Sequence, residues 1–157
     1  MERQLPCAVT GLSSAEQCDA ELRNAEVLAL WYRDQLAGVV GLTAADQHAI
    51  GWCWYWVFQD FRSRGIASAA LCVVANAALS TQWYRLEIGY QTNNSASARV
   101  AETAGFIVEG YERQKFIWGD TRVDAVLAAR LATDPWPQPK LTVELSSVAR
   151  LLGSESG

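Results

Sequence analysis

The chain has 157 residues, of which 50% are hydrophobic and 19% charged; this suffices for one domain with a buried core and is too short for two. Its formal net charge is -4 at pH 7, so no overall positive field would attract nucleic acid or an anionic membrane. Four cysteines without a C-x-x-C pair and a single histidine argue against a zinc site. No apolar run has the length of a signal peptide core or a membrane span. We therefore expect a cytoplasmic protein with reduced thiols.

Patterns in the first part of the chain predict a helix followed by three strands. Ser13–Glu16 has the composition of a capping box and would open a short helix that ends near Asn24. Strands are expected at Val27–Tyr32 and Leu36–Leu42, which form a hairpin, and at Ala49–Phe58. This order is the start of a mixed α/β domain.

The middle of the chain continues the alternation of helices and strands. Ala67–Leu79 is apolar almost all round and predicts a buried helix, and Trp83–Tyr90 is the next strand. Asn94 or Ser95 can cap a helix that runs through Glu102. Phe106–Leu131 then predicts a long hairpin.

The end of the chain differs in composition from what precedes it. We divide the chain into a domain over residues 1–134 and a proline-rich linker and tail over residues 135–157. Apolar residues at helical spacing favour a helix in this tail, namely Leu141, Leu145, Val148 and Leu152. Such a helix would fold back over the domain or cover a second subunit of a homodimer; the alternative is a frayed tail.

The segment RSRGIA, Arg62–Ala67, lies where a predicted strand ends and a predicted helix begins. The backbone N–H groups of such a turn are unpaired, and the positive end of the helix dipole lies behind them, so the turn can bind an anion. Gly65 lacks bulk, and Arg62 and Arg64 would add positive charge. The alternative is a solvated loop whose arginines face water.

Two motifs resemble those of a known family. Arg62–Ala67 resembles the Q/R-x-x-G-x-G/A pyrophosphate loop of the GNAT acetyltransferase superfamily, and NNSASARVAETAGF, Asn93–Phe106, is similar to a stretch of its RimJ/RimL-type branch. The resemblance covers Glu26–Leu131. It implies an α/β (α+β) fold with a central mixed, mostly antiparallel sheet, flanked by helices and splayed at an acetyl-CoA cleft. Only 25 residues precede Glu26, so the N-terminal helical region would be shortened.

The resemblance also implies contacts with acetyl-CoA. Backbone groups of Val57 and Phe58 would hold the pantetheine, Asn94 would reach the same arm, and Ser97 would stand near the sulfur and protonate the departing thiolate. The pyrophosphate would be bound by the backbone amides of Arg62, Ser63, Arg64, Gly65, Ile66, Ala67 and Ser68. For Ser97 the alternative is a local hydrogen bond at the start of its helix.

The sequence departs from the family at the general base, because the usual strand glutamate falls on Trp52. Substitute bases are His48, whose ordinary pKa suits the task, and the carboxylates Asp46, Glu87 and Glu112; each has an alternative as a solvated or paired surface group. Without a strong base, an α-amine is an easier acceptor than a lysine, because more of it is neutral at pH 7.

The strand that lacks the glutamate is rich in aromatic residues. Its alternation places Trp52, Trp54 and Trp56 on one face. We interpret Trp56 as core, while Trp52 and Trp54 would form either core or an aromatic wall for the acceptor, which would also attract a cationic amine.

These observations predict an N-acetyltransferase that moves acetyl from acetyl-CoA to a primary amine, either a protein N-terminus or a small molecule. Two alternatives stay open at this point. One is a non-catalytic acyl-CoA-binding or interaction domain, and the other is an enzyme with a different acyl donor, including an aminoacyl-tRNA. The net charge of -4 argues against the tRNA donor.

Overall fold

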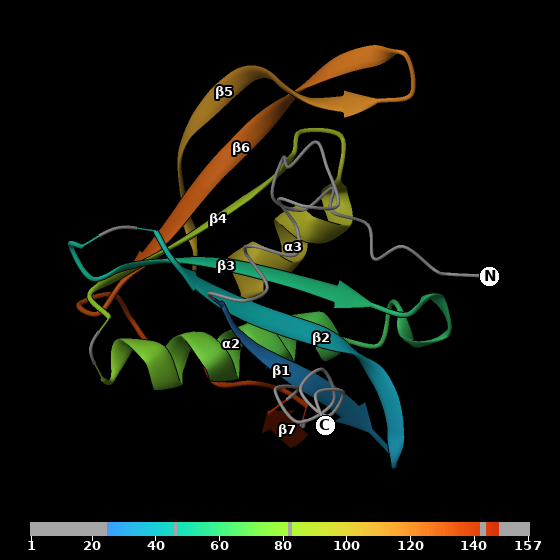
Figure 1. Cartoon of the computed structure of the whole chain (residues 1–157), viewed down its shortest axis with the longest axis vertical. Coiled ribbons are helices and arrows are strands. Elements are labelled where there is room, and N and C mark those ends of the chain that lie inside the picture. Colours follow the sequence, from blue (N-terminus) through green and yellow to red (C-terminus); the bar gives the residue numbers. More distant parts are fainter. Residues whose placement is uncertain (1–24, 46, 82, 142–143, 148–157) are drawn as a thin grey trace, which may run out of the picture.

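The computed structural model of the chain describes residues 25–45, 47–81, 83–141 and 144–147 (Figure 1). Three predictions fall outside these residues, namely the helix that ends near Asn24, the shortening of the N-terminal helical region and Asp46 as a base. Over residues 25–131 the described α-helices and strands follow the predicted order, with boundaries that differ by a few residues.

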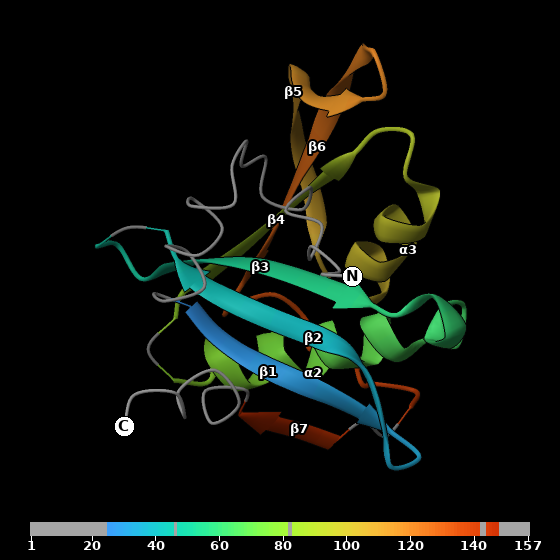
Figure 2. The same ribbon diagram turned by 45° about the vertical axis from the view of Figure 1, so that its right-hand side comes forward.

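Seven strands form one sheet in the order β5-β6-β4-β3-β2-β1-β7 (Figures 1 and 2). Among the described pairs only β3 and β4 run parallel, and the rest are antiparallel, which confirms the predicted mixed, mostly antiparallel sheet. The strands are β1 Ala25–Tyr32, β2 Gln35–Ala44, β3 Ile50–Val57, β4 Arg85–Gln91, β5 Ile107–Trp118, β6 Thr121–Leu131 and β7 Glu144–Ser147.

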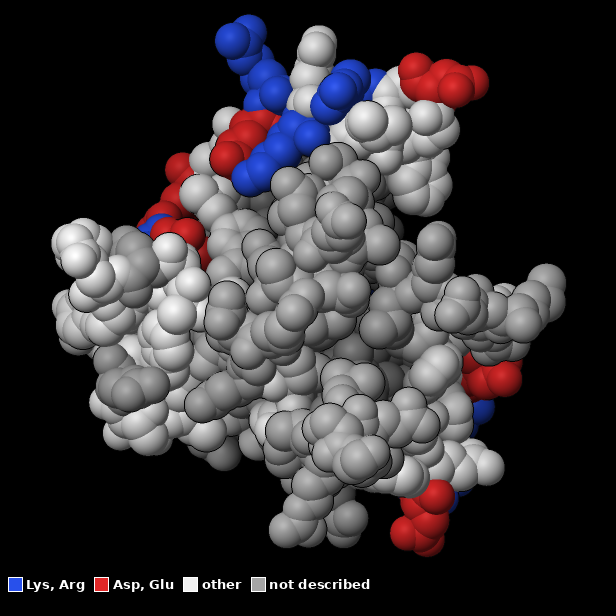
Figure 3. Space-filling model, viewed as in Figure 1, with Lys and Arg blue, Asp and Glu red and all other residues white. Residues whose placement is uncertain are grey.

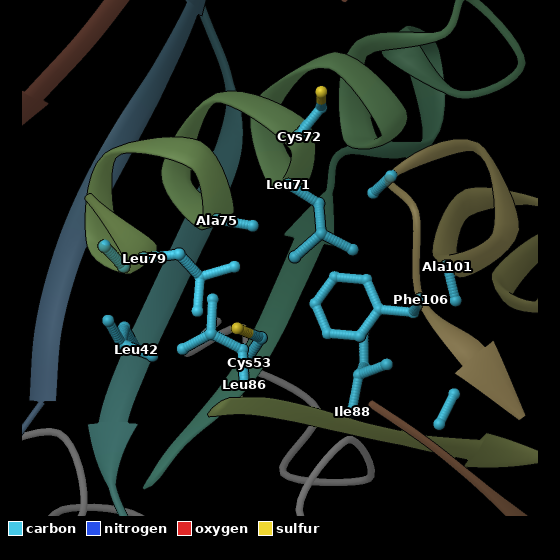
Figure 4. Close-up of a cluster of buried hydrophobic side chains, with 13 residues drawn as sticks. Leu42, Cys53, Leu71, Cys72, Ala75, Leu79, Leu86, Ile88, Ala101 and Phe106 are labelled. Atoms are coloured by element: carbon cyan, nitrogen blue, oxygen red, sulfur yellow. The ribbon is translucent and has the colours of Figure 1, made fainter. Parts of the chain in front are cut away.

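Helices α2 (Ile66–Leu79) and α3 (Ser95–Thr103) pack against one face of the sheet. Nine of the fourteen residues of α2 are buried, as its apolar sequence predicts. Between the helices and the sheet lies a core that includes Leu71, Ile88 and Phe106 (Figure 4). Cys53 is free and buried in this core, and burial raises its thiol pKa to about 12, so the thiol stays protonated.

The helix predicted for the tail is wrong for Glu144–Ser147, which form strand β7 instead. β7 pairs antiparallel with β1, with Ser147 opposite Leu28 and Glu144 opposite Trp31. The outer edge of β1 otherwise presents a row of unpaired backbone groups, and hydrogen bonding to them outweighs the helical spacing of the apolar residues. The tail therefore extends the sheet at this edge.

A buried arginine ties the end of the sheet to both helices. Arg130 of β6 is fully buried; one of its terminal nitrogens donates to the Ala104 carbonyl at 3.1 Å and the other to Asn76 Oδ1 at 2.6 Å. Asn76 in turn donates to the carbonyl of Pro137 at 3.2 Å. Arg130 therefore links β6, α2, the end of α3 and the proline-rich segment.

Replacing Arg130 with alanine should lower the free energy of unfolding by about 3 kcal/mol, because buried acceptors lose a charged donor and a cavity remains. Urea denaturation measures this loss. Arg122→Ala, which removes an exposed arginine from the same strand, is the matched control and should change stability little. Equal denaturation midpoints for the two variants would show that the buried network contributes no special stability.

Candidate active site

The sheet opens between β3 and β4. The two strands pair only over Ile50–Trp52 and Arg85–Glu87, near the start of each strand. Beyond this point β3 stays paired with β2, and β4 with β6, while β3 and β4 diverge (Figures 1 and 2). The structure therefore contains the splay that the sequence resemblance implied.

The hydrogen bonds of β2 and β3 fix which backbone groups of β3 face the opening. The Phe58 amide donates to the Ala37 carbonyl at 2.8 Å, and the Ala45 amide donates to the Ile50 carbonyl at 2.9 Å. Because bonded and non-bonded pairs alternate along an antiparallel ladder, the backbone groups of Tyr55 and Val57 point away from β2. Within the described sheet they have no strand partner, since β4 has already turned away.

The segment between β3 and α2 has the geometry of an anion-binding turn. Gly65 is the N-cap of α2 with φ of 77° in the left-handed region, and no side chain caps this helix. The first backbone bond of α2 runs from the Ala69 amide to the Gly65 carbonyl at 3.0 Å, so the amides of Ile66–Ser68 have no acceptor within the helix. These amides and the helix dipole are directed at one place.

The two arginines of this turn do not simply extend into water. Arg62 Nε donates to the Val57 carbonyl at 3.1 Å, which joins the turn to the free edge of β3. The guanidinium of Arg64 lies 5.9 Å from the centre of the Phe61 ring. Both side chains are exposed, so their charge can still reach an anion at the turn.

A hydrogen bond joins β3 to the start of α3. Asn94 caps the helix, since its Oδ1 accepts from the Ser97 amide at 3.0 Å. The Ser97 hydroxyl is not used in this cap and instead accepts from the Tyr55 hydroxyl at 2.9 Å. Ser97 therefore has the local helix-start bond that the alternative interpretation predicted, but through its backbone, and its hydroxyl is directed at β3.

Tyr55 is the residue of this site that the sequence analysis missed. Burial raises the pKa of its phenol; the Ser97 hydrogen bond opposes this shift only in part, and nearby Tyr90 adds to it. The phenol is therefore protonated at neutral pH and acts as the donor to Ser97. The available signal was the alternation of β3, which places Tyr55 on the same face as Cys53 and Val57.

The tryptophans of β3 share one face, as predicted, and it is the face opposite the helices. Trp56 is only half-buried there and belongs to neither described core cluster, so its interpretation as core is wrong. The Trp52 ring lies on β4, where a Cβ added to Gly89 would be only 2.9 Å from it. The Trp54 ring covers Gly41 of β2, and its Nε1 donates to Thr43 Oγ1 at 3.3 Å. The two rings therefore extend from β3 in different directions. Trp54 covers β2, and Trp52 covers β4 on the other side of the opening.

Two of the three carboxylates proposed as substitute bases, Glu87 and Glu112, are ion-paired, and Asp46 lies outside the described residues. Glu87 is opposite Trp52 in register, and its Oε1 lies 2.7 Å from Arg85 Nε. Arg85 also bonds both carboxylate oxygens of Glu109, and this hydrogen bonding lowers the pKa of Glu109. Glu112 pairs with Lys115.

His48 is not brought together with Ser97. It is exposed in the turn before β3, seven residues from Tyr55. At about 3.3 Å per residue the strand separates the two by roughly 20 Å. Among the described residues no group of three or more His, Cys, Asp or Glu side chains could hold a metal ion, and no described helix is long and apolar enough to cross a membrane.

Comparison with known proteins defines the family. The family model described as an acetyltransferase (GNAT) domain matches residues 10–107. The chain therefore belongs to the GNAT acetyltransferase family, as its two motifs predicted. No curated protein sequence matches the chain.

Solved structures agree with this assignment. A probable acetyltransferase is 27% identical with a TM-score of 0.64, over 74% of this chain and 66% of that protein, so this chain spans about two thirds of its length. RimL, a ribosomal L7/L12 α-N-protein acetyltransferase in complex with coenzyme A, is 21% identical with a TM-score of 0.67, and the match covers 74% of this chain and 70% of that protein. The microcin C7 self-immunity acetyltransferase MccE, in complex with acetyl-CoA and AMP, is 24% identical with a TM-score of 0.63, and the match covers 74% of this chain and 67% of that protein. The predicted GNAT fold is confirmed.

Proposed function

We propose that this protein transfers the acetyl group of acetyl-CoA to a primary amine by direct attack of the amine in a ternary complex. One observation carries the proposal: the uncapped start of α2 lies next to the backbone edge of β3 that the divergence from β4 leaves unpaired. A pyrophosphate and an amide-containing arm are the ligands that these two features suit.

The residues present fit acetyl-CoA as substrate. The amides of Ile66–Ser68 would bind the pyrophosphate, and Arg62 and Arg64 would add charge beside it. The Val57 amide and the backbone groups of Tyr55 would bind the pantetheine, since the Val57 carbonyl already accepts from Arg62. Phe58 is less suited, because its amide and carbonyl already bond Ala37 and Phe61.

Tyr55 and Ser97 would protonate the leaving thiolate. When the amine nitrogen bonds to the acetyl carbon and the carbon–sulfur bond breaks, the sulfur leaves with a negative charge. Ser97 would donate its hydroxyl proton to that sulfur while the Tyr55 phenol, which donates to Ser97, passes its own proton to the serine oxygen, and water then returns a proton to Tyr55. The extra proton of the attacking nitrogen goes to water.

The acceptor is best an amine that is partly neutral without help. Trp52 occupies the place of the family's glutamate and accepts no proton, and Glu87 is held by Arg85. An α-amine, with an ordinary pKa near 7.7 to 8.0, is neutral about a tenth of the time at pH 7, against about once in a few thousand for a lysine. A protein N-terminus or a small molecule with such an amine fits.

The second candidate is a non-catalytic domain that binds acyl-CoA, and Trp52 in place of the general base favours it. The Tyr55–Ser97 bond favours the enzyme, because binding alone requires no hydroxyl pair. The cytoplasmic location, the homodimer and the division after residue 134 remain predictions.

A thiol-release assay with acetyl-CoA and a panel of α-amino peptides, small α-amines, polyamines and aminoglycosides separates these candidates. Release that depends on an α-amine is the expected result. Tight binding of acetyl-CoA with no release for any acceptor would favour the non-catalytic domain, and absence of binding would contradict both.

A further inference from the structure

Strand β5 carries a bulge opposite the middle of β6. Glu112 is in register with Ala125 and Phe116 with Val123, so β5 has two more residues than β6 in this interval. Gln114 in the bulge has φ of 54°, and its amide donates to Asp124 Oδ1 at 2.7 Å. The hydrogen bond shows that the bulge has a defined conformation.

The bulge directs a lysine at the aromatic ring beside the opening. Lys115 Nζ lies 5.8 Å from the centre of the Trp52 ring, which in turn lies on Gly89 of β4. Lys115 therefore reaches Trp52, which is paired with β4 at the point where the two strands separate. An ammonium from the chain itself already lies at Trp52, so this ring is a poor place for a cationic acceptor.

Two further cations surround the same bulge. Arg122 of β6 donates to the carbonyl of Gln114 at 3.5 Å, and Arg113 is an exposed member of the bulge. Figure 3 shows lysine and arginine side chains gathered at the end of the molecule where the β5–β6 hairpin lies. We call Arg113, Lys115 and Arg122 the cationic bulge.

The cationic bulge is locally positive, whereas the chain as a whole has a negative net charge. The cationic bulge comprises three positive charges, and the nearby carboxylates are Glu112, which pairs with Lys115, and Asp124, which accepts from the Gln114 amide. The local balance is positive in a chain of net charge -4. The Glu112–Lys115 pair is exposed, so it contributes little to the stability of the protein, and another anion can replace Glu112 as the partner of Lys115.

We propose that the cationic bulge receives an anionic group of the acceptor, so that the preferred substrate is an amine whose own molecule carries a carboxylate or a phosphate. The inference rests on the proposed function and names its substrate class. Trp52 and Tyr55 are three residues apart on β3, about 10 Å along the strand, and their side chains lie on opposite faces of the sheet at its opening. A carboxylate on the second or third residue of a peptide, or a phosphate on a small amine, spans such a distance.

Two pairs of acceptors, whose members differ by one anionic group, test the proposal and its two sources of anion. The peptide arm compares Ala-Asp-Ala with Ala-Asn-Ala, both amidated at the C-terminus, and the small-molecule arm compares O-phosphoserine amide with serine amide, which both carry an α-amine. The thiol-release rate gives kcat/KM for each. We expect the charged member to be preferred at least tenfold in one arm or both, with a preference that weakens as salt is added.

The variant Lys115→Gln/Arg122→Gln shows whether the bulge causes this preference. It should reduce the ratio of kcat/KM between the charged and uncharged members about tenfold without changing the KM for acetyl-CoA. Lys140→Gln removes an exposed lysine outside the bulge and should keep the wild-type ratio. Equal denaturation midpoints would confirm that the double variant is folded.

The results separate failure of this inference from failure of the proposed function. Turnover with no preference for charge, or a preference that survives in the double variant, overturns the role of the bulge and leaves the acetyltransferase intact. Absence of acetyl-CoA binding and of turnover with every amine overturns both.

Discussion

Gly65→Glu should weaken acetyl-CoA binding at least 100-fold. A Cβ on Gly65 meets no atom within 4 Å, so the new side chain has room, but its carboxylate would lie beside the free amides of Ile66–Ser68 and compete with the pyrophosphate for them. Calorimetric titration of the wild type and the variant with acetyl-CoA measures the change.

Two controls separate charge from backbone strain. Gly119→Glu introduces the same charge at another glycine with positive φ, 59°, and open space around it, in the turn between β5 and β6. Its affinity for acetyl-CoA should remain that of the wild type. Gly65→Ala imposes the strain without the charge and should weaken binding less than Gly65→Glu. Wild-type affinity in Gly65→Glu would contradict the proposed pyrophosphate site.

Ser97→Ala should lower kcat about 100-fold, because the leaving sulfur loses its proton donor. Tyr55→Phe should lower kcat about tenfold, since the phenol acts through Ser97, and the double variant should resemble Ser97→Ala. The KM for acetyl-CoA should change little in all three. Thiol release at saturating acetyl-CoA, with the same α-amino peptide throughout, gives these values.

A purely structural role for Tyr55 predicts a different outcome. Tyr55→Phe would then lower the free energy of unfolding and leave kcat unchanged. In the double variant, its effect on the free energy of unfolding would add to that of Ser97→Ala. Tyr84→Phe, which removes an exposed phenol, serves as the control and should leave both quantities unchanged. Additive effects on kcat would contradict the proposed action of Tyr55 through Ser97.

The pH dependence follows from the direction of the Tyr55 shift. Burial raises its pKa above the usual 10.0, so the folded protein favours the neutral phenol. Its contribution to stability is complete below pH 10 and is lost as the pH rises toward the higher folded value. Tyr55 therefore imposes no loss of activity between pH 7 and 10.

The local patterns of the sequence were sufficient to predict strands β1 to β6, the two α-helices and the glycine turn between β3 and α2, whereas the arrangement of the sheet followed from the family resemblance. Each of these local elements depends on neighbours in sequence: the alternation of β3, the apolar run of α2 and the glycine between them. Strand β7 was mispredicted because its conformation depends on the free edge of β1, which is distant in sequence.

The parts of the site that sequence could not predict depend on register and on contacts between distant elements. The Tyr55–Ser97 bond joins residues 42 positions apart. Lys115 reaches Trp52 only because β5 contains two extra residues, and no residue pattern in that strand indicates such a bulge. The role of Arg130 was equally hidden, since its partners Asn76 and Ala104 lie on separate helical segments.

The proposed acetyl-CoA site lies between the free edge of β3, the start of α2 and the start of α3. Hydrogen–deuterium exchange of the whole protein with and without acetyl-CoA tests this location. We predict that acetyl-CoA slows exchange in peptides that cover Tyr55–Ser68 and Asn94–Ser97, and that Gly65→Glu abolishes this effect. Slower exchange confined to other segments, such as β1 and β2, would contradict the proposed site.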